Sequence, residues 1–381
     1  MNTVPLSLYV HLPWCVRKCP YCDFNSHTAG NAAPRARYIT ALLADLDGEA
    51  ERAESRPLTS IFLGGGTPSL FSPDEIATLV DGIAVRFALD DDIEITMEAN
   101  PGTVECGDPQ GYRQAGINRL SIGAQSFNAE SLARLGRIHS VDDIARAAAA
   151  AHAAGFSNIN LDVMYGLPGQ GIEDALSDLR AAAALAPAHL SWYQLTLEPN
   201  TVFYARPPAD LPNEDASFDM QTAGQALLSS IGYAQYEVSA YARDDQRCRH
   251  NLNYWSFGDY LAVGAGAHGK ISAAGNIWRY AKPVNPLEYM QGLEQGGPDV
   301  ELRALDERER VFEFMLNVLR LTAGFDQALF AERTGLEAGL LAEYLRPARQ
   351  KRLIEEISSG FWRVTWLGQR FLNDLQAEFL P

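Results

Sequence analysis

The sequence predicts an α/β fold in which a partial (β/α)6 barrel of the TIM type precedes a small winged-helix-like α+β domain. Three observations support this prediction. Strand-like and helix-like segments alternate from the N-terminus to about residue 240, Gly-rich and polar residues collect directly after the strand-like segments, and the composition changes beyond residue 298. Crossover helices make successive strands parallel, and polar residues after the strands are typical of the carboxyl end of a barrel. A doubly wound sheet is the alternative.

Seven segments are predicted to be strands because each is short and rich in apolar, β-branched or aromatic residues. They span residues 6–12, 60–63, 93–97, 119–122, 158–163, 189–195 and, with a weaker pattern, 234–241. Residues 1–13 have no basic region and no cleavage site. They are therefore predicted to contain the first strand rather than a signal peptide.

Two of the intervening helices have clear start signals. Ser72 and Glu75 form a capping box, with Pro73 at the first helical position, and this helix is predicted to end near residue 87. Ser140 and Asp143 start an Ala-rich helix that ends near residue 155. The Ala-rich runs are predicted to be helices packed close to the sheet rather than linkers.

The chain is predicted to have three parts. Residues 1–240 form the barrel, and residues 241–297, rich in Gly, Asn, Tyr and Trp, form loops and short strands that close over its mouth. Residues 298–381 form the last domain, with a helix over 301–321, a hairpin near 358–360 and a final helix reaching 379. This order resembles a winged helix, but the segment holds 11 Lys and Arg against 14 Asp and Glu, which disfavours DNA binding.

Composition narrows the class of protein. The chain has 381 residues, of which 47% are hydrophobic and 21% charged, as in ordinary globular proteins. Its net charge of −17 argues against nucleic-acid partners, because such binding draws on clustered positive charge. No stretch reaches the roughly 18 apolar residues that a membrane span needs. Close-set cysteines are typical of metal binding in a reducing compartment, so we expect a cytoplasmic protein.

Cys15, Cys19 and Cys22 form the sharpest pattern in the chain, with spacings of three and two residues. Three thiolates on one loop can hold three corners of a four-iron cluster and leave the fourth iron open to a small molecule. The alternative from the residues alone is a zinc site completed by His11 or His27. The pattern therefore predicts a metal centre directly after the first strand.

Other polar residues end or follow the predicted strands. The run at residues 64–69, GGGTPS, lets backbone amides approach a ligand without Cβ obstruction, or else makes only a tight turn. Glu98 ends the third strand, where its carboxylate can accept hydrogen bonds from ribose hydroxyls or an amine. Gln125, Arg137 and Asp162 are further candidates, although each is also compatible with an ordinary solvated or ion-paired residue.

A glycine-rich run at residues 264–270 matches G-x-G-x-x-G and most of a phosphate-binding loop. However, Ile271 stands where Ser or Thr is required, and the strand and helix that accompany a dinucleotide fingerprint are missing. We interpret this run as a close-packed loop over the site.

The Cys-x3-Cys-x2-Cys pattern after a first strand resembles the signature of the radical S-adenosylmethionine (SAM) superfamily. With GGGTPS, EANP, GAQSF, GRIH and LDVMYGLPGQ, the order and spacing over residues 9–269 resemble the anaerobic coproporphyrinogen III oxidase family. The resemblance implies a [4Fe-4S] cluster held by Cys15, Cys19 and Cys22. It also implies a SAM site formed by Tyr9, Gly65, Gly66, Thr67, Glu98, Gln125, Arg137 and Asp162.

Within that family the chain departs from the oxidases. They have a further cysteine two residues after the third, where this chain has Phe24, and a longer N-terminal extension than the 14 residues before Cys15. Both differences resemble the HemW-type heme chaperones. His250, Asn251 and Tyr254 match the H-N-x-x-Y heme-binding motif of those chaperones, and nearby aromatic rings can pack a flat macrocycle. From the residues alone, a loop histidine near aromatic rings is more often a structural group.

The resemblance implies a chaperone that binds heme and transfers it to apo-hemoproteins, including membrane-bound respiratory enzymes. It also implies a homodimer that depends on the cluster. One rival is oxidative decarboxylation of coproporphyrinogen III, and another is an iron-sulfur protein with no heme role. The sequence assigns no catalytic residue and leaves open whether SAM is cleaved.

Overall fold

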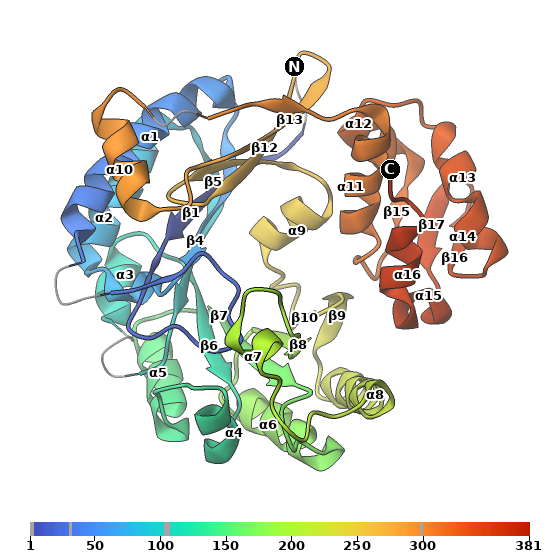
Figure 1. Ribbon diagram of the computed structural model, residues 1–381, viewed down its shortest axis with the longest axis horizontal. Helices are drawn as coiled ribbons and strands as arrows, with labels where there is room; N and C mark the ends of the chain where they lie inside the picture. Colours follow the sequence, from blue (N-terminus) through green and yellow to red (C-terminus); the bar gives the residue numbers. More distant parts are fainter. Residues whose placement is uncertain (1–3, 30–32, 103–106, 298–299) are drawn as a thin grey trace.

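The computed structural model describes residues 4–29, 33–102, 107–297 and 300–381. Figure 1 shows a curved sheet with helices along its outer side and a separate helical domain beside the open side of the curve. Within these residues, no helix has both the length and the apolar character needed to cross a bilayer.

Six consecutive parallel strands form the barrel. Each pairs with the next one along the chain, so the strand order does not reverse as it does in a doubly wound sheet. The partial-barrel prediction is confirmed and the alternative is wrong. The strands are β1 (Leu6–Leu12), β4 (Leu58–Gly65), β5 (Leu89–Ala99), β6 (Arg119–Gln125), β7 (Asn158–Tyr165) and β8 (His189–Gln194).

Further strands extend the sheet at both edges, giving twelve strands in the described part of the chain. One edge carries β10 (Ala240–Ala242) and β9 (Ala234–Glu237), which replace the single weak strand predicted there. The other edge carries β11 (Asp259–Val263), parallel to β1, then the antiparallel β12 (His268–Ala273), β13 (Asn276–Ala281) and β14 (Arg303–Ala304). The segment after residue 240 thus widens the sheet beside β1, whereas the sequence predicted loops and short strands that close over the barrel mouth.

Helices cover the outer side of the sheet because their apolar faces pack on Leu, Ile and Val side chains of the strands. Both predicted capping boxes are present, with Ser72 accepting from the Glu75 amide and Ser140 from the Asp143 amide. The outer helices are α1 (Arg35–Ala53), α2 (Pro73–Arg86), α3 (Pro109–Gln114), α4 (Ala129–Arg134), α5 (Val141–Ala153), α6 (Ile172–Ala184), α8 (Glu214–Ser230) and α10 (Pro286–Glu294). Shorter elements are β2 (Trp14–Cys15), β3 (His27–Thr28), η1 (Pro68–Leu70), α7 (Val202–Ala205) and α9 (Arg249–Trp255).

The C-terminal domain has its own core around Phe314, which packs edge-on against Phe257, Phe325 and Phe330. Asp306 caps its first helix, so the helix is shorter than the predicted 301–321. The helices are α11 (Glu307–Val318), α12 (Gln327–Thr334), α13 (Leu340–Tyr344), α14 (Arg346–Gln350), α15 (Trp366–Arg370) and α16 (Leu372–Ala377). They pack with a small sheet of β15 (Phe325–Asp326), β17 (Phe361–Val364) and β16 (Ile354–Ser358). The predicted boundary at 298 lies outside the described residues.

Candidate functional site at the mouth of the barrel

The inner face of the barrel is polar, although its outer face is apolar. Along β1, Leu8 and Val10 are fully buried under the helices, whereas Tyr9 and His11 face inward and hydrogen-bond each other at 3.0 Å. Because strand side chains alternate between faces, each parallel strand contributes a similar inward series. The polar groups at the carboxyl ends of the strands meet at the barrel mouth, where the sequence placed the candidate site.

The cysteine loop starts at the carboxyl end of β1. The β2 and β3 strands pair in parallel and hold the base of the loop closed, while Lys18 Nζ donates to the Phe24 carbonyl at 3.0 Å. Cys15, Cys19 and Cys22 are each partly buried and carry free thiols. Burial raises the pKa of the Cys15 thiol and the pKa of the Cys22 thiol. The loop therefore presents three shielded thiols on one turn of chain.

Arg137 links this loop to the strands. Its guanidinium donates to Cys19 Sγ at 3.6 Å, to Asn100 Oδ1 at 2.7 Å and to the Gly123 carbonyl at 3.0 Å. Asn100 also donates to Thr67 Oγ1 at 3.1 Å. Two predicted site residues, Arg137 and Thr67, are thus joined through Asn100. The sequence analysis quoted this asparagine within EANP without assigning it a role.

The glycine run packs closely against the cysteine loop. The Gly65 amide donates to Glu98 Oε2, the Gly66 amide to the Leu12 carbonyl and the Thr67 amide to the Trp14 carbonyl. These amides are already paired within the chain. The glycines are required because a Cβ on Gly65 would lie 2.4 Å from the His11 ring and one on Gly66 would lie 2.6 Å from the Trp14 carbonyl. The run seats the cysteine loop against the barrel.

Glu98 and Asp162 bring two carboxyl groups into the same interior. Burial and, second, the charge of Asp162 raise the pKa of Glu98 to about 7, although the Gly65 amide opposes this. Burial also raises the pKa of Asp162, whose oxygens accept from Ser121 at 3.0 Å and Asn160 at 2.8 Å. A carboxyl pair of this kind is poised to receive a cationic group, because an adjacent positive charge would relieve its mutual repulsion.

Gln125 and Tyr9 complete the predicted set. Gln125 has a left-handed backbone conformation, with φ of 67°, and its Oε1 accepts from the Tyr193 hydroxyl at 2.8 Å. A non-glycine residue in this region costs free energy that the surrounding structure must compensate. Tyr9 lies beside Glu98. Burial and, second, the charge of Glu98 raise the pKa of the Tyr9 hydroxyl. Tyr193 carried no sequence signal, because only the alignment of β8 with β6 and β7 brings it to Gln125.

The thiols, rather than the nearby histidines, are the metal-binding candidates. His11 Nε2 is 2.8 Å from the Asn25 carbonyl and its Nδ1 is engaged by Tyr9, while His27 Nε2 is 3.0 Å from Asn25 Oδ1. Among the described residues, no three His, Cys, Asp or Glu side chains converge on a single-ion site. Three separate thiols with a neighbouring guanidinium fit an anionic four-iron cluster, in which three of the irons each take one thiolate.

The glycine run at 264–270 is a packed loop, as interpreted. A Cβ on Gly264 would lie 2.4 Å from the His11 carbonyl, and one on Gly266 would lie 2.4 Å from Asn25 Nδ2 of the cysteine loop. Lys270 is fully buried and donates to Asp259 Oδ1 at 3.0 Å and to the Phe257 carbonyl at 3.0 Å. Its ammonium group is therefore held inside the fold rather than presented to a phosphate.

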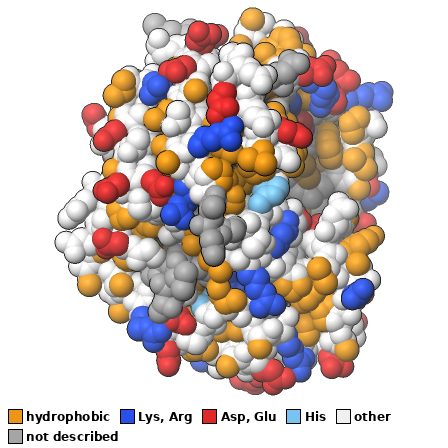
Figure 2. Space-filling model, turned by 60° about the vertical axis from the view of Figure 1, so that its left-hand side comes forward, with side chains coloured by type: hydrophobic (Ala, Val, Ile, Leu, Met, Phe, Trp, Pro, Cys, Tyr) orange, Lys and Arg blue, Asp and Glu red, His pale blue; other side chains and the backbone are white. Residues whose placement is uncertain are grey.

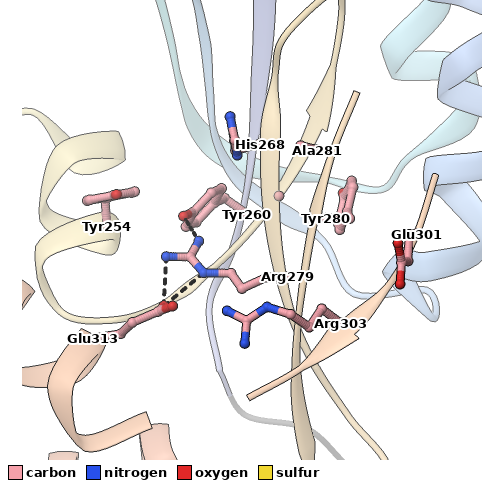
Figure 3. Close-up of a pocket in the computed structure, with 10 residues that line it drawn as sticks. Tyr254, Tyr260, His268, Arg279, Tyr280, Ala281, Glu301, Arg303 and Glu313 are labelled. Carbon is pink, nitrogen blue, oxygen red and sulfur yellow. Dashed lines mark hydrogen bonds and ion pairs between the residues drawn. The ribbon is translucent and has the colours of Figure 1, made fainter. Parts of the chain in front are cut away.

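The residues of the H-N-x-x-Y motif lie on α9, near the amino ends of β1 and β4. His250 is buried, its Nδ1 is 3.2 Å from Ser60 Oγ and its ring packs on Phe62 at 5.1 Å. Burial and, second, the charge of Arg119 lower the pKa of His250 to about 3, so the ring is neutral. Tyr254 instead lines a cavity with Tyr260 and Arg279 (Figure 3), and Asn251 is half-buried. The structure does not bring His250 and Tyr254 onto one open surface.

The barrel and its thiol-bearing loop define a radical SAM protein. The chain matches the Radical SAM superfamily over residues 9–182 and the HemN C-terminal domain over residues 305–371. It is 48% identical to "Heme chaperone HemW" of Escherichia coli (strain K12), covering 99% of this chain and 98% of that relative, and 33% identical to the Bacillus subtilis (strain 168) protein of the same name, covering 98% and 99%. The chain belongs to the HemW heme chaperone family.

One solved structure shares the whole fold. "Coproporphyrinogen III oxidase (HemN) from Escherichia coli is a Radical SAM enzyme" superposes with a TM-score of 0.82 at 24% sequence identity, covering 100% of this chain and 91% of that one. This likeness shows the fold, including the C-terminal domain. Membership of the radical SAM superfamily implies a [4Fe-4S] cluster and SAM.

Proposed function

We propose that this chain binds heme and delivers it to hemoproteins that lack it. The observation that carries the proposal is the similarity to heme chaperones along the full chain. The sequence adds a second support, because Phe24 stands where the related oxidases have a fourth cysteine. We do not propose oxidase activity, since the structural likeness to the oxidase extends to the fold alone.

The proposed cluster ligands are Cys15, Cys19 and Cys22, and the cluster would supply a one-electron donor beside bound SAM. Arg137 would balance the negative charge of the thiolates, since its guanidinium already contacts Cys19. Glu98 and Asp162 would receive the SAM amino group, because a cation beside two carboxyls lowers their repulsion. The remaining proposed SAM contacts are Tyr9, Gly65, Gly66, Thr67 and Gln125.

For the cargo, the proposed residues are His250, Asn251 and Tyr254, which all lie on α9. The proposed acceptors are apo-hemoproteins, with membrane-bound respiratory enzymes among them. We also propose that the protein is located in the cytoplasm and that its chain divides into three parts, residues 1–240, 241–297 and 298–381. We further propose that it forms a homodimer when the cluster is assembled. Equal sizing-column masses for cluster-free and cluster-loaded protein would exclude the dimer.

Two assays on one preparation test the function. The full-length protein with its cluster is loaded with hemin and mixed with an apo-hemoprotein. Heme transfer is measured by the absorbance of the acceptor, and we expect the spectrum of the heme-loaded acceptor to appear. The same preparation is then incubated anaerobically with SAM, a reductant and coproporphyrinogen III, and the porphyrins are resolved by mass. Loss of two carboxyl groups would contradict the proposal, whereas we expect no product.

A further inference from the structure

Asn100 lies at the centre of a chain of hydrogen bonds that reaches the cysteine loop. It directly follows β5, and its backbone amide donates to Ser69 Oγ at 3.4 Å. Its side-chain Oδ1 accepts from Arg137 at 2.7 Å, and its Nδ2 donates to Thr67 Oγ1 at 3.1 Å. Arg137 in turn donates to Cys19 Sγ at 3.6 Å. One side-chain amide thus joins a guanidinium that contacts a cysteine to a hydroxyl on the glycine run.

Thr67 forms the other arm of this chain. Its side chain is buried, and its amide donates to the Trp14 carbonyl at 2.7 Å, which places it beside Cys15. Burial raises the pKa of the Cys15 thiol, and a hydrogen bond from the Thr67 hydroxyl opposes this effect. The two arms that meet at Asn100 therefore end at two different cysteines, Cys15 and Cys19.

The neighbours of Asn100 fix which way round its amide lies. A guanidinium has only donors, so the amide oxygen must face Arg137. The NH2 group then faces Thr67 and donates to its oxygen. Because a hydroxyl has a single hydrogen, the hydrogen of Thr67 is left for the Cys15 sulfur. An aspartate in this place would have a second acceptor oxygen in the position of the NH2 group, and it would take that hydrogen itself.

We propose that Asn100 is a positioning residue for the cluster. It holds Arg137 and Thr67 as donors to two of the three cysteine sulfurs, and it thereby raises the reduction potential of the bound cluster. Hydrogen bonds to the sulfurs help to set the potential of an iron-sulfur cluster, because a donor stabilises the more negative, reduced state. This role rests on the proposed cluster and goes beyond it, since it assigns a group that tunes the cluster without touching it.

A second asparagine at the same pair of strands shows what a purely structural role looks like. Asn118 precedes β6, where its Oδ1 accepts from the Ile95 amide at 2.8 Å and its Nδ2 donates to the Ile93 carbonyl at 2.7 Å. Both partners are backbone groups of β5, so this amide supports the sheet. The side chain of Asn100 instead holds two side chains that each contact a cysteine.

The test measures the reduction potential of the cluster in full-length protein, without SAM and without heme. A redox titration is followed by electron paramagnetic resonance of the reduced cluster. Asn100→Leu removes both side-chain hydrogen bonds and adds no charge. We expect one-electron reduction to become about tenfold less favourable, which is a shift of about 59 mV to lower potential. Asn118→Leu is the matched control, and it should leave the potential unchanged.

Two further variants separate positioning from packing. Asn100→Asp keeps the shape of the side chain but adds a negative charge and competes for the Thr67 hydrogen, so it should also lower the potential. Thr67→Val removes the hydroxyl donor alone. Its shift and that of Asn100→Leu should sum to more than the shift of the double variant, because part of the effect of Asn100 passes through Thr67.

Four results would overturn this role. If both Asn100 variants hold full iron at the wild-type potential, Asn100 does not tune the cluster, and the proposed heme function stands. If the shifts of Thr67→Val and Asn100→Leu are fully additive, Asn100 does not act through Thr67. If neither Asn100 variant retains iron while the Asn118 control does, Asn100 serves assembly and not tuning. If the wild type itself holds no cluster after reconstitution with iron and sulfide, the proposed cluster fails, whatever the separate hemin-transfer assay shows.

Discussion

The two ends of the barrel interior are both polar, but they differ in what their polar groups contact. At the floor, Ser7, Ser60 and His250 form a chain of side-chain contacts, and Glu94 accepts from the His250 amide at 3.2 Å. At the mouth, Glu98 and Asp162 have raised pKa values, with the charge of Asp162 contributing to the shift of Glu98, and the cysteines carry free thiols. The floor groups are paired with one another, whereas the mouth has a carboxyl group whose charge its protein partners do not fully compensate.

This difference teaches that polar residues inside a barrel do not by themselves mark a binding site. A matched group, such as the Asp259 carboxylate between Lys270 and Arg56, stabilises the fold. A group whose charge is opposed, such as Glu98, is a better candidate for binding a ligand. Figure 2 shows that the outer surface adds little guidance, since acidic and basic side chains are interspersed over the face it displays and hydrophobic ones gather near its centre beside a histidine.

The largest expected effect is a loss of bound iron when a cysteine at the barrel mouth is replaced, but not when Cys248 near the floor is replaced. Cys15→Ala, Cys19→Ala and Cys22→Ala should each reduce bound iron to background after anaerobic reconstitution, because each removes one corner ligand of the proposed cluster. Cys248→Ala is the control. Its thiol is buried against Glu94 at 3.5 Å and burial raises its pKa to about 12. Full iron in any of the three loop variants would exclude that cysteine as a ligand.

A second experiment tests whether the glycine run seats the cysteine loop. Gly66→Ala places a Cβ 2.6 Å from the Trp14 carbonyl, which is backbone and cannot rotate away. We expect a loss of about 2–3 kcal/mol in the free energy of unfolding, measured by urea denaturation, together with poorer cluster retention. Gly339→Ala is the matched control, since nothing lies within 4 Å of its added Cβ. Equal stability of the two variants would contradict the packing argument.

A third experiment tests the floor. His250→Ala removes a buried ring that packs on Phe62 and contacts Ser60, and we expect a loss of about 2 kcal/mol at pH 7.5. The folded-state pKa of about 3 lies below the ordinary value, so wild-type stability falls as the pH drops below about 6.5. The deficit of the variant should therefore shrink on acidification. If the stability difference between the wild type and the variant stays constant down to pH 4, the His250 ring is not buried in its neutral form.

The smallest expected effect has the opposite pH dependence. Glu98 has a raised folded-state pKa of about 7, so its ionisation costs stability, and the cost grows as the pH rises from about 4.5 through 7. In protein free of SAM, Glu98→Gln should be more stable than the wild type by roughly 1–2 kcal/mol at pH 8, after allowance for partial exposure, and equal to it at pH 4. Thermal unfolding at the two pH values measures this. A variant that is less stable than the wild type at pH 8 would show that other groups of the folded protein stabilise the negative charge of Glu98.

Local sequence signals predicted most of the fold. The strand β1 begins and ends where the apolar run does, and the capping boxes at Ser72 and Ser140 start α2 and α5 as expected. Capping and strand alternation depend on neighbours within a few residues, so the sequence contains that information directly. The spacing of Cys15, Cys19 and Cys22 likewise placed all three on one loop, because short spacing leaves little alternative.

Long-range contacts decided the rest. The sequence did not reveal that residues 259–281 widen the sheet, because β11 gains its position only by pairing with β1, some 250 residues away. It therefore did not show that α9 directs His250 into the barrel and Tyr254 toward a cavity lined by Tyr260, His268 and Arg279. Local patterns determined which segments are strands and which thiols lie together. Only the tertiary structure decided which polar groups are already paired, since pairing depends on the whole fold.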